Sequence, residues 1–364
     1  MNPLQPFEPQ APGDFLEEVL QKKGWSQRDF AAVLGRPVQA VNEIIAGKKA
    51  ITAETAIALS EALGLSAHYW LELQNRYRLD VLQRRKNPKD ESRVQRRARL
   101  FSKAPVNELI KRQWIDADLS DLDRTERALC HFLGIKSLDD EPEGFSPRKT
   151  QRGTPHTAAQ IAWGWRVRNV ARAMKSARYS KDRLLKLISD LPSWSRSDDD
   201  MKRVPGALAS VGVRLVFVEH LSGTRIDGGA LWLGEIPVVA LSLRYDRVDW
   251  FWFTLLHELA HIIEQQASLD QQLVGNDAQR NESEDEKSAD RQATQWLIPQ
   301  DQLQSFIRAA RPYFSRSAIL NFADRCKVHP GIVVGQLQKR GDVPYSHHRN
   351  LLTRVRHLFI ESAS

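Results

Sequence analysis

Residues that can do chemistry are concentrated in one apolar stretch, residues 252–263, which contains the sequence His-Glu-Leu-Ala-His. On a helix, residues four positions apart lie on one face, so His257 and His261 point the same way. Two imidazoles at this spacing can hold one tetrahedral zinc ion, each at about 2.0–2.1 Å. Glu258 then lies beside the metal, where its carboxylate can take a proton from a water that the metal activates. Such a pentapeptide also arises by chance, so a site needs a third ligand.

A second segment, residues 283–297, offers that ligand. It turns from acidic to amphipathic before a proline, and its apolar residues recur at helical spacing. Glu286 and Asp290 would lie one turn apart on this helix. Glu286 can complete a site of two histidines and a glutamate, and Asp290 can accept the second ring N–H of a ligand histidine. Alternatively, acidic side chains collect at a helix N-terminus because the helix dipole favours them there.

This pair of helices resembles the thermolysin-like zinc peptidases, and residues 204–299 resemble the ImmA/IrrE family of metallopeptidases. The motifs that carry the second resemblance are Ile-Asp-Gly-Gly from residue 226, Pro-Val-Val-Ala-Leu-Ser-Leu from residue 237, and the two metal-ligand motifs. The resemblance implies a zincin-like α+β domain with a small sheet, and proteolysis of a transcriptional repressor. It implies zinc, with manganese as the other metal considered, bound by His257, His261 and Glu286, and Glu258 as the catalytic base. Gln292 departs from the family, which has an aromatic core residue there.

The N-terminal residues show a different pattern. Five short apolar-periodic segments follow one another over residues 13–79, separated by glycines, and predict an all-α domain of five helices. Ser26 and Asp29 have the spacing of a capping box, and Gly35 makes a tight turn before a third helix. A short helix, a tight turn and a further helix form a helix-turn-helix. In this motif the second helix enters the major groove of DNA.

Six side chains of this domain are candidates for contacting double-stranded operator DNA. Gln39 and Asn42 are expected to read bases, because each amide can pair with two atoms of adenine. The alternative is that they are ordinary polar surface. The candidates for phosphate contacts are Gln27, Arg36, Lys48 and Lys49. The motifs Gly-Trp-Ser-Gln-Arg-Asp-Phe-Ala from residue 24 and Tyr-Trp-Leu-Glu-Leu-Gln from residue 69 resemble the XRE class and, within it, the HigA-type antitoxins. That resemblance implies a repressor that binds inverted repeats as a homodimer.

Composition indicates a globular, mainly α, multidomain protein of 364 residues, with 41% hydrophobic and 27% charged residues. It has no apolar run of about 18 residues, no signal-peptide pattern and only two cysteines, so we expect a cytoplasmic protein without a membrane partner. The net charge is +8, and residues 81–115 carry eleven basic against three acidic side chains. We expect this stretch to be a solvated linker or, beside a DNA-binding domain, to lie near phosphates.

Composition shifts also predict the domain boundaries and one substrate-binding strand. Residues 238–243 are expected to form a strand beside the zinc helix that holds an extended substrate by strand addition. We assign no role to His329, His347 or His348. The predicted divisions are a tail over 1–12, the helix-turn-helix domain over 13–79, a basic helical connector over 80–138, a linker over 139–156, a helical segment over 157–203, the metallopeptidase domain over 204–345 and a C-terminal tail over 346–364.

The preferred interpretation is a DNA-binding transcriptional regulator that carries a zinc-dependent endopeptidase. Its expected substrate is a protein of the repressor or antitoxin type, or its own linker over 139–155. Two alternatives stay open. The C-terminal domain can be a metal or peptide sensor that cleaves nothing, or the whole chain can be a HigA-like antitoxin.

Overall fold

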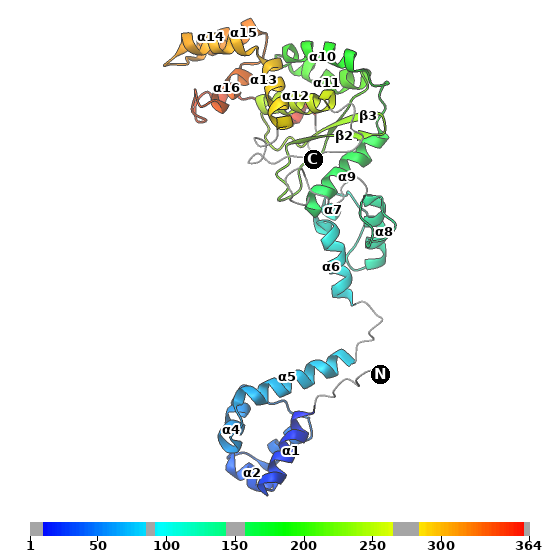
Figure 1. The fold of residues 1–364 in the computed structure, drawn as a ribbon, viewed down its shortest axis with the longest axis vertical. Helices are drawn as coiled ribbons and strands as arrows, with labels where there is room; N and C mark the ends of the chain where they lie inside the picture. Colours follow the sequence, from blue (N-terminus) through cyan, green and yellow to red (C-terminus); the bar gives the residue numbers. More distant parts are fainter. Residues whose placement is uncertain (1–9, 85–91, 143–156, 265–283, 360–364) are drawn as a thin grey trace. The chain divides into compact units, whose positions relative to one another are not determined.

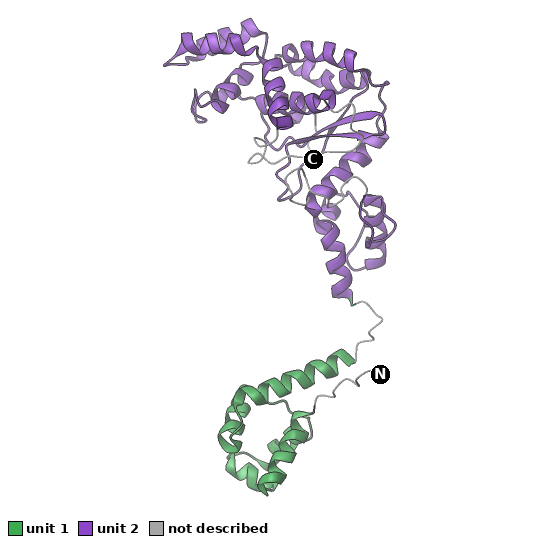
Figure 2. Cartoon of the chain, in the orientation of Figure 1, with its two compact units in different colours: residues 1–92 green, residues 93–364 purple. Residues whose placement is uncertain are grey.

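The computed structural model describes residues 10–84, 92–142, 157–264 and 284–359. The chain divides into two compact units, residues 1–92 (unit 1) and residues 93–364 (unit 2), as Figure 2 shows. Each unit has hydrophobic core clusters of its own. Within the described ranges, no helix has the length and apolar character needed to cross a bilayer. The mainly α, multidomain architecture expected from the sequence is confirmed.

Unit 1 is a bundle of five helices, as the spacing of its apolar residues predicts. Leu16, Phe30, Val41 and Trp70, which come from four different helices, are fully or almost fully buried in its core. Val38, the first residue of its helix, is 37% exposed. The helices are α1 (Pro12–Lys23), α2 (Gln27–Val33), α3 (Val38–Ile45), α4 (Ala53–Leu63) and α5 (Ala67–Arg84) (Figure 1).

Unit 2 is built around a three-stranded sheet of order β1-β3-β2. The strands β1 (Arg214–Phe217) and β3 (Ile236–Leu241) run parallel, and β2 (Gly228–Leu233) pairs antiparallel with β3. Successive residues of a strand point to opposite faces, and both faces of this sheet are apolar. Leu215, Ala230 and Val239 belong to one core cluster, whereas Val216, Leu231 and Ala240 belong to another. The sheet is therefore the middle of three layers.

Helices from the middle of the chain cover one face of the sheet. Trp163, in this layer, is fully buried and donates from its indole N–H to the carbonyl of Val218, at 2.9 Å. The structure therefore differs from the predicted division into a connector, a helical segment and a metallopeptidase domain, because the sheet needs these helices to bury its second face. They are α6 (Arg93–Lys103), α7 (Val106–Lys111), α8 (Leu122–Leu133) and α9 (Ala158–Ala173).

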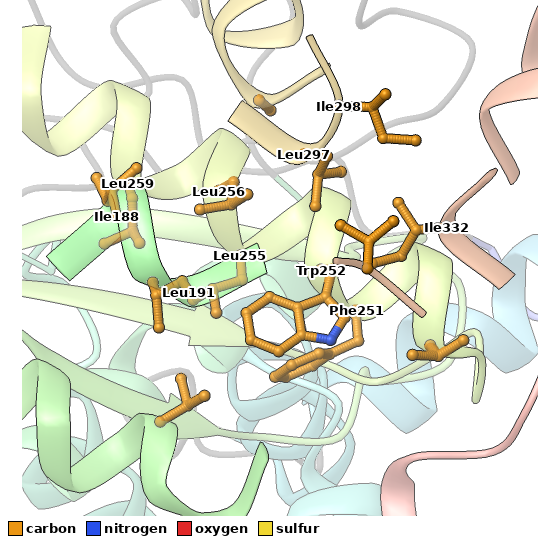
Figure 3. Close-up of a cluster of buried hydrophobic side chains, with 14 of the residues drawn as sticks. Ile188, Leu191, Phe251, Trp252, Leu255, Leu256, Leu259, Leu297, Ile298 and Ile332 are labelled. Atoms are coloured by element: carbon orange, nitrogen blue, oxygen red, sulfur yellow. The ribbon is translucent and has the colours of Figure 1, made fainter. Parts of the chain in front are cut away.

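The other face packs against the helix that carries the histidine motif and against its neighbours. Figure 3 shows Phe251, Trp252 and Leu255 in this cluster, with Leu297 and Ile332 contributed by later helices. The elements of this layer are α10 (Lys181–Trp194), α11 (Asp198–Ser210), α12 (Val248–Glu264), α13 (Glu284–Leu297), α14 (Gln300–Ala310), α15 (Arg316–Cys326), α16 (Pro330–Lys339) and two short 3-10 helices, Arg349–Leu351 and Arg356–Leu358.

The basic stretch of residues 81–115 is largely engaged inside unit 2, although it was expected to be a linker or to lie near phosphates. Arg96 pairs with Asp123 and Glu126 of α8. Arg99 pairs with Asp139, at 2.8 Å. Residues 85–91 of the stretch lie outside the described residues. The charge surplus on α6 therefore holds α6 against α8, which the linear charge count alone does not reveal.

The C-terminal residues also differ from the predicted tail. Leu351 and Val355 are buried in the same core cluster as α12. Phe359 stacks on Phe251 with ring centres 4.8 Å apart. The residues 346–359 therefore belong to the second unit, and residues 360–364 lie outside the description. The predicted linker over 139–156 falls mostly in the undescribed range 143–156.

Candidate metal centre and DNA-binding helix

The histidine motif lies in the middle of α12, a helix that is buried almost all round. Leu255, Leu256 and Leu259 pack into the core and fix the rotation of the helix about its axis. His257 and His261 are only 2% and 7% exposed. Burying a polar side chain costs free energy unless it has partners, so these two imidazoles require a specific environment.

That environment is Glu286 of α13, the helix that lies alongside α12 (Figure 1). Nε2 of His257 and Nε2 of His261 are 3.1 Å apart. The two carboxylate oxygens of Glu286 lie 3.2 Å from Nε2 of His257 and 3.6 Å from Nε2 of His261. Donors around one tetrahedral zinc, each at about 2.0–2.1 Å, are themselves about 3.4 Å apart. The three donors thus fit a single metal ion. Among the described residues, they are the group of side chains whose ligand atoms lie close enough together to hold a metal ion.

The charge state of Glu286 suits a ligand. Burial alone would raise the pKa of Glu286, but hydrogen bonds from His257 and His261 outweigh burial and hold its pKa below its usual range. The side chain is therefore a carboxylate at neutral pH. A carboxylate and two imidazoles are the ligand types that zinc takes at sites with an open position.

Asp290, one turn further along α13, supports the first histidine. Its Oδ1 lies 2.9 Å from Nδ1 of His257. A carboxylate on Nδ1 favours the tautomer that directs the lone pair of Nε2 at the metal position. Burial raises the pKa of Asp290, but the contact with His257 and the charge of Lys339 hold it below its usual range.

Lys339 of α16 belongs to the same cluster, although no sequence pattern indicates this. Its Nζ lies 3.1 Å from Oδ2 of Asp290 and 4.2 Å from the ring centre of Phe253. No periodic pattern could connect Lys339 to a residue 49 positions earlier, because only the packing of α16 on α12 brings them together. The resulting order of contacts is Lys339, Asp290, His257 and then the metal position.

Glu258 lies against the start of β2 and is 3% exposed. A Cβ atom on Gly228 would lie 3.0 Å from Oε1 of Glu258 and 2.6 Å from Cγ2 of Thr254. A residue without a side chain is therefore required at this position for the strand to approach α12 so closely. Oε1 of Glu258 thus lies beside the start of β2.

The expectation for the substrate-binding strand needs a correction. The residues 238–243 belong mainly to β3, which is the central strand and is paired on both sides. The sequence could not distinguish the strands because both are short and apolar. β2 is an edge strand whose only partner in the described part of the sheet is β3. The start of this strand, at Gly228, lies beside Glu258.

In unit 1 the local structure of the helix-turn-helix follows the predicted capping box. The Ser26 hydroxyl accepts from the backbone N–H of Asp29, at 3.1 Å, and the Asp29 carboxylate accepts from the backbone N–H of Ser26, also at 3.1 Å. Hydrogen bonds from Ser26 hold the pKa of Asp29 below its usual value. These reciprocal bonds satisfy N–H groups that the first turn of α2 leaves without helical partners.

The candidate DNA-contacting residues all lie around α2 and α3. Gln39 and Asn42 are exposed on α3, and Gln39 donates to Glu43 at 3.1 Å. Lys48 and Lys49 are exposed just after α3, and Gln27 is half-buried at the first position of α2.

Arg36 differs from the other candidates. Its guanidinium donates to the hydroxyl of Thr55 at 3.0 Å, so this side chain also holds α4 against the turn between α2 and α3. It therefore combines a structural contact with its expected position near phosphates.

His329, for which no role was expected, has a structural one. It is the N-cap residue of α16, and its Nδ1 accepts from the backbone N–H of Gly331 at 3.0 Å. Its own backbone N–H donates to the buried hydroxyl of Ser195. This histidine anchors α16, the helix that carries Lys339.

Comparisons with known proteins match the first unit. The helix-turn-helix family model covers residues 16–70. The chain is 38% identical over 68 residues to YddM, an uncharacterised HTH-type transcriptional regulator of Escherichia coli K12, covering 19% of this chain and 72% of that protein. It is 36% identical over 76 residues to virulence-associated protein I of Dichelobacter nodosus. This match covers 21% of this chain and 70% of that protein. A solved HigA-family addiction module antidote protein from Coxiella burnetii is 31% identical and matches 22% of this chain and 87% of its own, with a TM-score of 0.21.

Proposed function

Because this chain belongs to the helix-turn-helix family of transcriptional regulators through residues 16–70, we propose that it couples DNA binding in unit 1 to peptide-bond hydrolysis in unit 2. Unit 1 is a DNA-binding helix-turn-helix domain. Its α3 enters the major groove of an operator, as the second helix of such a pair does, and exposes Gln39 and Asn42 there. Operators with inverted repeats bind two such domains, so the regulator acts as a homodimer on DNA.

In unit 2, His257, His261 and Glu286 hold one zinc ion. The observation that carries this proposal is the convergence of their donor atoms, with separations of 3.1 to 3.6 Å. A bound zinc ion supplies a Lewis acid that polarises a peptide carbonyl and activates water at neutral pH. Manganese is the other metal to test.

The protein's own residues supply the remaining roles. The Glu258 carboxylate takes a proton from the attacking water and returns it to the nitrogen of the leaving amine. Asp290 orients the His257 ring through Nδ1. The free edge of β2 binds an extended segment of the substrate by main-chain hydrogen bonds, which places a peptide group beside Glu258.

This mode of binding indicates the class of substrate. Strand addition requires a segment of protein that is extended and not already paired in a sheet. The candidate substrates are another repressor, an antitoxin-type protein and this chain itself. Cleavage of a repressor would relieve repression at the operator that this repressor binds.

Two measurements test the proposed peptidase. The first is the zinc content of the purified protein, and the second is cleavage of a proteome-derived peptide library, with products identified by mass spectrometry. We expect zinc and cleavage in the wild type, but zinc without cleavage in Glu258→Gln. The matched control is Glu235→Gln, an exposed residue of the turn between β2 and β3, which should cleave normally. Zinc binding with no cleavage by the wild type would instead support a metal-dependent sensor.

A further inference from the structure

A cavity of about 560 Å³ lies between α12, α13 and α16, behind the metal-ligand set. Asp290 belongs to the wall of this cavity as well as to the metal centre. Leu297, Ile332 and the rings of Trp250 and Phe253 make much of the remaining wall apolar. Cavities of about 300–1,000 Å³ with mostly apolar walls and a few polar groups are the usual binding sites for small molecules.

The cavity wall carries more positive than negative charge. Arg247 is matched by Asp249, to which it donates from Nε at 3.0 Å and from a terminal nitrogen at 2.7 Å. The Asp290 carboxylate contacts both His257 and Lys339. This leaves Lys339 as a cation whose partner carboxylate is shared, beside an apolar space.

A second cation of the wall is also only partly matched. Arg340 lies 3.2 Å from Asp342, but the same carboxylate pairs with Arg311. One carboxylate thus faces two guanidinium groups. An anion that enters the cavity meets this positive surplus at the α16 side.

We propose that this cavity binds a small organic anion with an apolar body. The body lies between Phe253, Leu297 and Ile332, and the acid group is bound by Lys339 and Arg340. An aromatic or branched aliphatic carboxylate has this chemistry. None of the groups that bind the anion is a proposed metal ligand, and the cavity is present whether or not unit 2 cleaves peptides.

The test uses the full chain and two probes with the same body, naphthalene-2-carboxylate and naphthalene-2-carboxamide, in equilibrium dialysis. We expect saturable binding of the carboxylate at one site and about tenfold weaker binding of the neutral amide, because a charged hydrogen bond is lost. Lys339→Gln removes the cation and should weaken carboxylate binding by a similar factor. Arg340→Gln removes the second cation of the wall, and provides a second variant that should also bind the carboxylate more weakly.

The matched control is Lys186→Gln, an exposed lysine of α10 outside the cavity, which should bind the carboxylate as the wild type does. Circular dichroism establishes that each variant is folded before dialysis. Absence of saturable carboxylate binding, equal binding of the two probes, or unchanged binding in both Lys339→Gln and Arg340→Gln would overturn the proposal. Weaker binding in either folded variant, with the control unchanged, would support it.

Discussion

At the residue scale, the candidate metal centre depends on contacts between helices that the chain separates widely. The spacing of His257 and His261 predicts that they share a face of α12, and the structure has their Nε2 atoms 3.1 Å apart. Glu286 lies near Nε2 of His257, at the proposed metal position, whereas Asp290 lies near Nδ1 of the same ring. A metal site of this kind is sensitive to the partners behind its ligands as well as to the ligands.

Replacement of Asp290 by Asn tests the role of this partner. The substitution Asp290→Asn would leave the three donors in place but remove the carboxylate that orients His257, so we expect zinc affinity to fall by about 10- to 100-fold. Competition with a chelator of known zinc affinity measures the change. Asp301→Asn, an exposed position in the first turn of α14, is the matched control. Equal zinc affinity in Asp290→Asn and the wild type would contradict the assigned role.

Replacement of Gly228 by Ala tests the contact between β2 and Glu258, the proposed catalytic base. The added Cβ would lie 2.6 Å from Cγ2 of Thr254 and 3.0 Å from Oε1 of Glu258. We expect the displacement to reduce peptide cleavage by about a hundredfold, since such small misplacements of reacting groups are costly, while zinc stays bound.

The matched control for that variant is Gly206→Ala on α11. A Cβ there meets nothing within 4 Å, so cleavage should not change. The double variant Gly228→Ala with Thr254→Ser removes the closest clash and should recover part of the cleavage rate. Full cleavage by Gly228→Ala would show that the strand does not position Glu258.

At the element scale, capping and close packing fix the helix-turn-helix. The capping box of Ser26 and Asp29 sets the start of α2, and a Cβ on Gly13 would lie 2.1 Å from the carbonyl oxygen of Ile45, so α1 packs directly on the end of α3. The orientation of α3, and with it the exposure of Gln39 and Asn42, follows from these contacts.

Ser26→Ala should therefore destabilise unit 1 by about 1 kcal/mol, the usual cost of losing an N-cap side chain. The pKa of Asp29 should rise toward its ordinary value of 3.8, because the hydrogen bonds from Ser26 are the main cause of its depression. Denaturant unfolding of the fragment 1–92 measures the first effect and a carboxyl-detected NMR titration measures the second. An unchanged Asp29 pKa in the variant would contradict this account of the cap.

Local patterns predicted most of the elements, whereas long-range packing was beyond their reach. Helical periodicity and caps predicted the five helices of unit 1, and the i, i+4 spacing predicted which donors share a face. The same patterns could not tell that β3 is central and β2 is the edge, since both strands are uniformly apolar. They also could not place Lys339 beside Asp290 or turn the basic residues of α6 toward α8, because these contacts join residues distant in sequence.

At the scale of the whole molecule, some basic side chains are exposed beside α3 and others are paired with carboxylates inside unit 2. Lys48 and Lys49 are exposed beside α3, where phosphates approach a helix-turn-helix. Arg96, in contrast, pairs with Asp123 and Glu126 within unit 2, and its pKa is raised by hydrogen bonds to these two carboxylates. The charge of Arg96 is therefore engaged in contacts within unit 2.

Two charge-neutralising variants test these two groups of basic residues separately. Lys48→Gln should weaken binding to duplex DNA and lower the slope of log affinity against log salt by about 1, as expected for one lost phosphate contact. Arg96→Gln should leave the slope unchanged and lower the stability of unit 2 by up to about 1 kcal/mol, the range for exposed ion pairs. Fluorescence anisotropy over a salt series measures both slopes. A reduced slope in Arg96→Gln would place α6 on the DNA.

The zinc content of three purified full-length proteins tests the central claim most directly. The wild type and Glu258→Gln should each contain about one zinc ion per chain, whereas Glu286→Gln should lose most of it, because zinc sites with an open position use three protein ligands. Inductively coupled plasma mass spectrometry provides the measurement. A wild type that stays empty after zinc is added back, or full occupancy in Glu286→Gln, would contradict the assignment of His257, His261 and Glu286 as the ligands.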